Sequence, residues 1–115
     1  MYTINRAISV VKSNKPFLDW LHSIENDGNS KITMEDLLRE CSTFLLPDYD
    51  FESEYKQAIK DIYEDIFEIE LEGWYTDESL WPKDRSYKVF CEWFDIEIHS
   101  CVYDPWEGEI EKEIL

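Results

Sequence analysis

The stretch FESEYKQAIKDIYEDIFEIELEG, residues 51–73, decides the fold class of this 115-residue chain. Its apolar residues recur every three or four positions, which is the spacing of one face of an α-helix. Gly73 follows the last turn, where a glycine commonly caps a helix. We therefore predict a helix over about 51–72 with one buried apolar stripe. The stripe consists of Tyr55, Ile59, Ile62, Ile66 and Ile69, widened by Tyr63 and Phe67.

The opposite side of this predicted helix is acidic. Such a face is usually solvated, but regular negative charge on a rigid helix can also imitate a nucleic-acid backbone. In that case the protein would inhibit a DNA-binding partner, and both interpretations remain open. The acidic face consists of Asp61, Glu64, Asp65, Glu68 and Glu72.

Three segments outside the helix have the composition of β-strands. Residues 3–11 are rich in β-branched side chains, and residues 42–46 form a short apolar run before Pro47. Residues 95–104 alternate, so that neighbouring side chains point to opposite faces. One face of this last strand would carry Ile96, Ile98 and Val102, and the other Glu97, His99, Cys101 and Tyr103.

Three further helices are predicted between these strands. One begins at Lys15-Pro16 with Asn14 as its cap, and a short one begins after Thr33. The third places Tyr87, Phe90, Cys91 and Phe94 on one face, which predicts that Cys91 is buried. The order β-α-α-β-α-α-β indicates an α+β (or α/β) fold, with a small three-stranded sheet and about four helices packed mainly on one of its faces.

Composition limits the class of protein. The hydrophobic share of 43% is enough for one core, so we expect one globular domain over 1–104 and an acidic C-terminal tail over 105–115. The net charge is −16, and residues 48–78 hold twelve acidic and two basic residues. Such a field disfavours direct binding of nucleic acid or an anionic membrane. It leaves a basic or amphipathic protein partner, with the chain itself a monomer or a homodimer.

The expected cellular compartment is inferred from the cysteines, the first residues and the length of the apolar runs. The three cysteines form an odd set without tight spacing, which suits a reducing compartment. The first residues lack the pattern of a signal peptide, and no apolar run has the length of a membrane helix. We therefore expect a cytoplasmic protein.

The stretch ENDGNSKITMED, residues 25–36, resembles a calcium-binding loop. Glu25, Asp27, Asn29 and Asp36 fall at ligand positions of such a loop. Three departures oppose this: Glu25 is long for the first position, Ser30 replaces the usual glycine, and Asp36 is too short for bidentate binding. The alternative makes Thr33 a helix cap, Asp36 a partner of the helix dipole, and residues 26–28 a turn. We favour the alternative and expect no metal or cofactor.

The stretch GWYTDESLWPKD, residues 73–84, is the candidate binding segment, and we call it the aromatic connector. Tryptophan and tyrosine side chains commonly anchor protein interfaces. The alternative is that this segment folds onto the core as a lid, with Asp77 or Thr76 capping a helical turn. The candidate binding residues are Trp74, Tyr75, Asp77, Glu78 and Trp81.

A catalytic alternative rests on the last predicted strand. His99 and Cys101 are two residues apart and would share a face with Glu97, as the nucleophile and base of a small enzyme do. Residues two apart on a strand are about 6.5 Å apart, which is long for direct proton transfer. A zinc site built from His22, Cys41, Cys91, His99 and Cys101 lacks any metal-ligand spacing.

Two stretches carry a family resemblance: YTINRAISVVKSNKPFLDWL, residues 2–21, and ELEGWYTDESLWPKDRSYKVFCEWFDIEIHSCVYD, residues 70–104. The chain resembles a family of small, acidic, uncharacterised bacterial proteins over most of its length up to about Asp104. The segment GWYTDESLWP is the most specific part of the match. The resemblance implies a bacterial cytosolic single domain, and it carries over no activity, ligand or catalytic residue.

Taken together, these features indicate a non-enzymatic cytosolic interaction protein that uses its acidic helix and aromatic connector. The small enzyme with a His/Cys site on the open sheet face and the acidic nucleic-acid mimic are the two alternatives.

Overall fold

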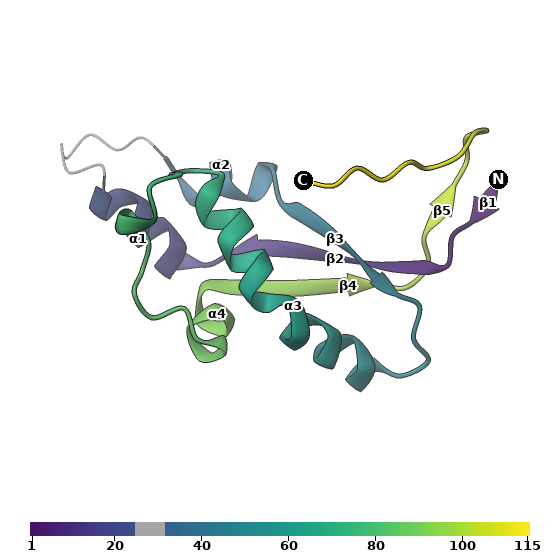
Figure 1. Cartoon of the computed structure of the whole chain (residues 1–115), viewed down its shortest axis with the longest axis horizontal. Coiled ribbons are helices and arrows are strands. Elements are labelled where there is room, and N and C mark those ends of the chain that lie inside the picture. Colours follow the sequence, from purple (N-terminus) through teal and green to yellow (C-terminus); the bar gives the residue numbers. More distant parts are fainter. Residues whose placement is uncertain (25–31) are drawn as a thin grey trace.

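The computed structural model describes residues 1–24 and 32–115, and it confirms a mixed α+β fold. A three-stranded antiparallel sheet has the order β3-β2-β4 (Figure 1). The central strand β2 (Arg6–Ser13) pairs with β3 (Ser42–Pro47) on one side and β4 (Phe94–His99) on the other. In the described part of the chain the helices are α1 (Lys15–Ile24), α2 (Met34–Arg39), α3 (Glu52–Glu72) and α4 (Tyr87–Trp93), with a 3₁₀ turn η1 (Glu78–Leu80).

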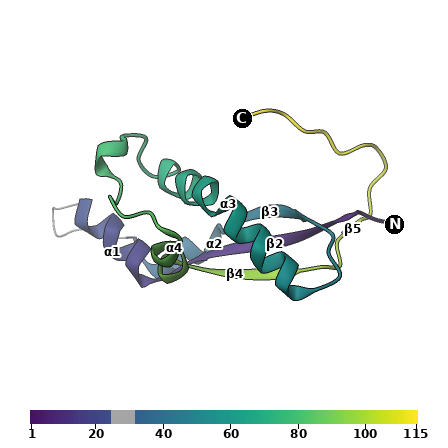
Figure 2. The same cartoon turned by 60° about the horizontal axis from the view of Figure 1, so that its bottom comes forward.

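Helix α3 runs obliquely across one face of the sheet (Figures 1 and 2). The alternation of β2 turns Ala7, Ser9 and Val11 toward this face, where all three are buried. Helices α1 and α4 add Phe17, Leu21 and Phe90 to the same core. The opposite, open face of the sheet carries Ile8, Val10, Thr43, Leu45, Glu97 and His99.

The predicted stripe of α3 is correct along most of its length and wrong at its end. Ile59 is 4% exposed and Ile66 is fully buried, but Ile69 is 38% exposed. Phe67 and Leu71 are buried in the last turns instead. The buried residues Tyr55, Ile59, Phe67 and Leu71 are separated by multiples of four, and four residues exceed one 3.6-residue turn, so this row drifts around the helix. The predicted stripe through Ile66 and Ile69 alternates steps of three and four and does not follow this drift, so its last residue leaves the buried side.

The predicted strand over 95–104 is wrong in its second half. Strand β4 ends at His99, and residues 103–104 form β5 (Tyr103–Asp104), which pairs with β1 (Tyr2–Thr3) in a separate two-stranded ladder. The Ile4 amide donates to the Val102 carbonyl and helps to redirect the chain. Cys101 and Tyr103 consequently do not continue the face of β4 that carries Glu97 and His99.

Capping chemistry fixes the helix ends. Thr33 and Asp36 form a reciprocal capping box at α2, with 3.0 and 3.2 Å between donor and acceptor, so the capping interpretation is confirmed. Gly73 closes α3 as predicted. The side chain of Asn14 differs from the prediction, because its amide donates to the Glu92 carbonyl and the Asp95 carboxylate instead of capping α1.

Cys91 is exposed, so the prediction of its burial is wrong. Helix α4 has only seven residues, and Phe90 fills its contact with the core. A helix advances by about 100° per residue, which turns Cys91 away from that contact.

Residues 105–115 form neither helix nor strand and are exposed, and we call them the C-terminal arm. The arm leaves the body beside β1 and β5 (Figure 2). Its root is held by the Tyr2 hydroxyl, which donates to the Glu107 carboxylate at 2.8 Å. Among the described helices, none has the length and apolar character needed to cross a membrane.

Candidate functional site

The aromatic connector folds onto the core. The Trp81 side chain is 9% exposed, and its indole Nε1 donates to the Tyr75 carbonyl at 2.8 Å. Trp20 of α1 donates to the Leu80 carbonyl at 2.9 Å. Asp77 caps η1 by accepting from the Ser79 amide. These contacts are those expected of a lid, the alternative to a binding cleft.

The remaining connector residues are dispersed. Trp74 is 42% exposed and lies at the edge of a hollow beside α2, while Glu78 is exposed on η1. Hydrogen bonds from the Ser79 hydroxyl and amide lower the pKa of Asp77, consistent with its capping role. The hollow that Trp74 lines is formed with residues of α2, β2, β3 and the end of α3, and neither Trp81 nor His99 is among its lining residues.

All five carboxylates of the acidic face are exposed along one side of α3. Glu64 and Glu68 share a shallow hollow with Lys83 and Arg85 of the segment after η1. Lys83 and Arg85 therefore offset part of the negative charge in the middle of the acidic face. Exposed carboxylates on a helix are usually solvated, and their position alone identifies no ligand.

The candidate catalytic residues His99 and Cys101 have different surroundings in the structure. His99 Nε2 is 3.2 Å from Glu97 Oε2 on the open sheet face, and Lys12 is 3.3 Å from Glu97. The hydrogen bonds from His99 and Lys12 lower the pKa of Glu97. Cys101 instead lines a separate hollow with Asp48 and Tyr103. The polar partner of His99 in the structure is thus a carboxylate rather than the thiol that a Cys–His site requires.

Of the four candidate calcium ligands, one lies within the residues that the structure describes. Glu25, Asp27 and Asn29 lie outside the described residues. Asp36 is engaged in the capping box, where its hydrogen bonds with Thr33 lower its pKa. Within residues 1–24 and 32–115, no group of three or more His, Cys, Asp or Glu side chains is placed to hold a metal ion.

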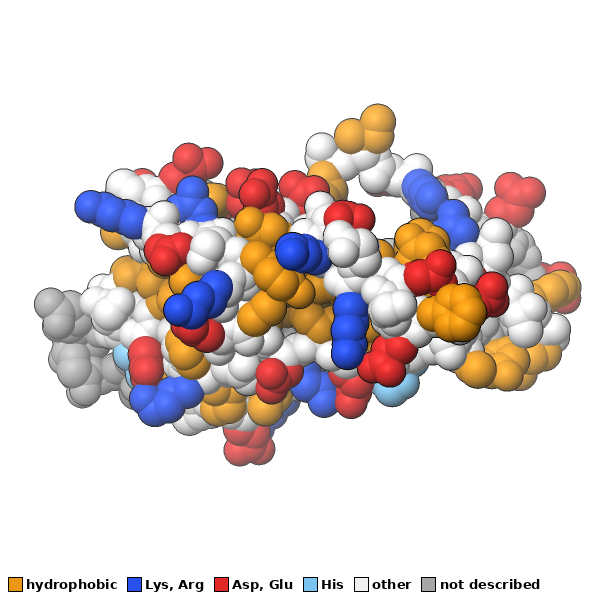
Figure 3. Space-filling view, turned by 90° about the horizontal axis from the view of Figure 1, so that it is seen from below, with side chains coloured by type: hydrophobic (Ala, Val, Ile, Leu, Met, Phe, Trp, Pro, Cys, Tyr) orange, Lys and Arg blue, Asp and Glu red, His pale blue; other side chains and the backbone are white. Residues whose placement is uncertain are grey.

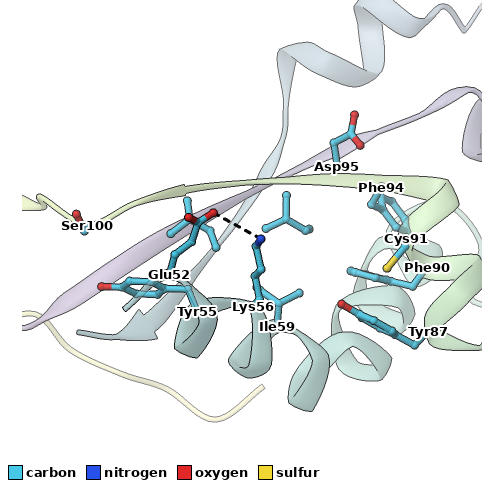
Figure 4. A pocket seen from close by; sticks show the side chains of 12 residues that line it. Glu52, Tyr55, Lys56, Ile59, Tyr87, Phe90, Cys91, Phe94, Asp95 and Ser100 are labelled. Atoms are coloured by element: carbon cyan, nitrogen blue, oxygen red, sulfur yellow. Dashed lines mark ion pairs between the residues drawn. The ribbon is translucent and has the colours of Figure 1, made fainter. Parts of the chain in front are cut away.

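An apolar hollow lies between α3, α4 and β4, and we call it the α3–β4 groove. Its cavity volume is about 530 Å³. One wall is β4 and the residues just after it, the facing wall is the first two turns of α3, and α4 closes one end (Figure 4). Figure 3 shows hydrophobic side chains gathered in the middle of this side of the molecule, with Lys and Arg side chains beside them. The apolar lining is Tyr55, Ile59, Tyr87, Phe90, Phe94, Ile96 and Ile98.

The spacing of these residues along their helix or strand explains why their side chains face the groove. Tyr55 and Ile59 are one helical turn apart, so both face the sheet from the start of α3. Ile96 and Ile98 are two apart on β4, so both face α3. Because α3 crosses the sheet at an angle, its first turns diverge from the closed end at α4 and leave the groove between them.

Polar groups stand at the edges of the groove. Lys56 reaches from α3 toward β4 and pairs with Glu52 at 3.7 Å (Figure 4). Lys60 lies over the Tyr87 ring, with its Nζ 5.3 Å from the ring centroid. Burial and then a hydrogen bond with Cys91 raise the pKa of Tyr87.

The backbone of β4 adds a second feature to the groove. In the described structure β4 has one strand neighbour, β2, so its outer edge is unpaired. A free strand edge offers a row of N–H and C=O groups to an incoming extended segment. The groove therefore combines backbone hydrogen-bonding groups with an apolar floor.

A second hollow lies beside α2 and contains a partly buried acid. Burial raises the pKa of Glu70, while a hydrogen bond from the Ser42 side chain lowers it. Glu70 Oε1 is buried with no hydrogen-bond partner in the described structure. Asp36, Glu40 and Cys41 line the same hollow. With three carboxylates, this hollow is unsuited to an anionic or apolar ligand.

Sequence reasoning missed the groove because three distant segments form it. Residues 52–59, 87–91 and 94–100 each carry helical or strand spacing, and that spacing indicates only burial. The one local signal was the polar and reactive content of an apolar helix face, namely Lys56 beside Tyr55 and Cys91 beside Phe90.

The chain was compared with protein-family models, with curated proteins and with solved structures, and nothing matched in any of the three.

Proposed function

We propose that this chain is a non-enzymatic interaction protein that holds an extended, amphipathic segment of its partner in the α3–β4 groove. The observation that supports this is an apolar groove that runs beside an unpaired strand edge. A segment laid along such an edge gains main-chain hydrogen bonds, and its alternate side chains enter the groove. The groove supplies both kinds of contact at one place.

The groove also defines the chemistry of the segment. Strand β4 has six residues and is roughly 20 Å long, which fits a partner strand of about the same number of residues. Every second side chain of that strand would be apolar, to meet Ile59, Ile96 and Ile98. The residues of the partner segment between these apolar ones would be acidic and would lie close to Lys56 and Lys60 at the edge of the groove.

This proposal moves the binding surface away from the aromatic connector, because the Trp81 and Trp20 indoles use their donors inside the protein. The acidic face of α3 acts through its field, which repels nucleic acid and other polyanions. The small enzyme is not favoured, since His99 pairs with Glu97 on the open sheet face while Cys101 lies beyond the end of β4.

Two exposed cysteines provide a direct test. Cys91 lies in the wall of the groove, whereas Cys101 is exposed outside it. Extended peptides selected from a random display library on this chain should carry alternating apolar residues. They should slow alkylation of Cys91 in proportion to the occupied fraction, and leave alkylation of Cys101 unchanged.

The matched control is a chain whose Cys91 already carries a bulky maleimide, in a Cys41→Ser/Cys101→Ser background that leaves no other thiol to react. It should no longer bind the selected peptides. Peptides that bind the blocked chain equally well, or a selection that enriches none, would contradict the proposal.

A further inference from the structure

We propose that the segment held by the α3–β4 groove is the C-terminal arm of a second copy of this chain, so that two copies exchange arms. This inference rests on the proposed function of the groove. It names one occupant, which the charge, length and position of the arm support.

The arm has the chemistry that the groove requires. Beyond Gly108 it reads EIEKEIL, in which Glu109, Glu111 and Glu113 alternate with Ile110, Lys112 and Ile114. Ile110, Ile114 and Leu115 are exposed, and the last two are fully so. As an extended strand, the arm places Ile110 and Ile114 on one face, with the long aliphatic stem of Lys112 between them. These apolar side chains are left in water by the single copy.

The local charge of the groove permits the same match. Residues 104–115 carry five acidic side chains and one basic side chain. The groove and its edge hold Lys56 and Lys60, which are the two basic residues within the acidic stretch 48–78. Glu52 and Asp95 also line the groove and balance these two lysines, and Glu52 is paired with Lys56. An acidic and apolar strand therefore meets no net negative charge there, in contrast to the acidic face of α3.

The arm is long enough to fill the groove. Its root is fixed by the β1–β5 ladder and by the Tyr2–Glu107 hydrogen bonds. Gly108 has a φ of 100°, a left-handed conformation that glycine adopts readily, and it allows the arm to turn there. Seven residues remain after Gly108, and extended they span roughly 23 Å. Strand β4 is roughly 20 Å long by the same rise per residue.

Position favours exchange between copies over docking within one chain. From its root the arm runs along the β3 side of the sheet, whereas the groove opens on the β4 side (Figures 1 and 2). The open end of the groove, at Ser100, lies near the end of the molecule from which the arm departs. Two copies related by a two-fold axis at that end could each insert an arm into the other's groove.

Two copies with a charge of −16 each repel one another at long range. At about 0.15 M salt this repulsion is screened beyond about 8 Å, while contacts inside the groove remain. We therefore expect an association that depends on concentration, measured at that ionic strength.

The first experiment measures molar mass by sedimentation equilibrium over a range of concentrations. The full chain should shift from monomer to dimer, and the full-length variant Ile110→Glu/Ile114→Glu should remain a monomer. The control is Leu45→Glu on the open sheet face, where Leu45 is 49% exposed, and it should dimerise like the unaltered chain. A chain that is monomeric at every concentration, or a dimer that is lost in Leu45→Glu but kept in the arm variant, would overturn the inference.

The second experiment mixes two chains that each lack one half of the contact. One carries Cys41→Ser and Cys101→Ser with Cys91 blocked by a bulky maleimide, so it has an intact arm and a filled groove. The other is the Ile110→Glu/Ile114→Glu variant, with an intact groove. Each alone should be monomeric, and the mixture should form a heterodimer through one arm. Failure to form it, or protection of Cys91 that is unchanged on dilution of the unaltered chain, would show that no arm is exchanged.

These outcomes separate the inference from the function on which it rests. A monomeric chain whose groove still binds selected peptides would refute arm exchange and leave the groove as a partner site. A groove that binds neither arm nor peptide would refute both.

Discussion

The lid role of the aromatic connector gives the sharpest prediction about stability. Replacing Trp81 by Phe removes the donor that meets the Tyr75 carbonyl at 2.8 Å. A lost hydrogen bond to a buried acceptor costs about 1–3 kcal/mol. Replacing Trp81 by Ala also leaves a cavity under the connector, and truncation of a buried aromatic residue costs about 3–5 kcal/mol. Because Trp81 is only 9% exposed, we expect the Ala variant to fall in that range.

Urea unfolding followed by far-ultraviolet circular dichroism measures this loss without depending on tryptophan fluorescence. With a slope of about 1–3 kcal/mol per molar urea, the Phe variant should lose roughly 1 M in its midpoint. Trp74→Ala is the control, because Trp74 is 42% exposed and should change stability by much less. If Trp81→Ala cost under about 1 kcal/mol, or less than Trp74→Ala, the connector would not be a lid and its indoles would be free for a partner.

Three further predictions concern single side chains. Burial raises the pKa of Glu70 above its ordinary value of 4.5. The carboxyl group of Glu70 therefore keeps its proton to higher pH in the folded chain than in the unfolded chain. The free energy of unfolding consequently falls as the pH rises through the pKa of the folded state. Glu70→Gln should therefore be more stable than the unaltered chain at pH 8, with a smaller difference near pH 4.5; urea midpoints that differ equally at both pH values would contradict this. Thr33→Ala should cost about 1 kcal/mol by removing the α2 cap, a loss that thermal melting would reveal. His99→Ala should raise the pKa of Glu97, because the hydrogen bond from His99 is the largest cause of its lowering; an unchanged carboxyl titration by NMR would show that the pair does not form in solution.

Local sequence signals predicted the elements whose causes are local. Thr33 and Asp36 are three residues apart, and a capping box needs only those two side chains and the backbone between them. The strand predicted over 3–11 from its β-branched residues is largely β2, which spans 6–13, while Thr3 belongs to β1. The helix predicted over about 51–72 from its periodicity is α3, which spans 52–72. The order of these elements and the three-stranded sheet then followed from the need to bury one face of each.

The features that the sequence did not reveal depend on tertiary arrangement. Ile69 has the spacing of the core stripe, but the oblique path of α3 carries it off the sheet. Cys91 adjoins the buried Phe90, but the short α4 turns it toward the groove. Strand β4 ends at His99 because β1 competes for residues 103–104, and such pairing between the two ends of a chain has no local signature.

The same reasoning explains why the proposed binding surface differs from the aromatic connector that the sequence suggested. An indole is a good interface anchor when its ring and its N–H are both available to a partner. Here the donors of Trp20 and Trp81 are used inside the protein, and they close the connector over α1. The side chains left available are aliphatic and lie along β4, where a partner strand can also satisfy the free backbone edge. An unpaired strand edge beside an apolar groove is a stronger indication of a binding site than aromatic content. Such a place combines backbone N–H and C=O groups that lack a strand partner with apolar side chains that remain exposed to water. If the groove holds a segment as we propose, the lysines beside it favour carboxylates on that segment.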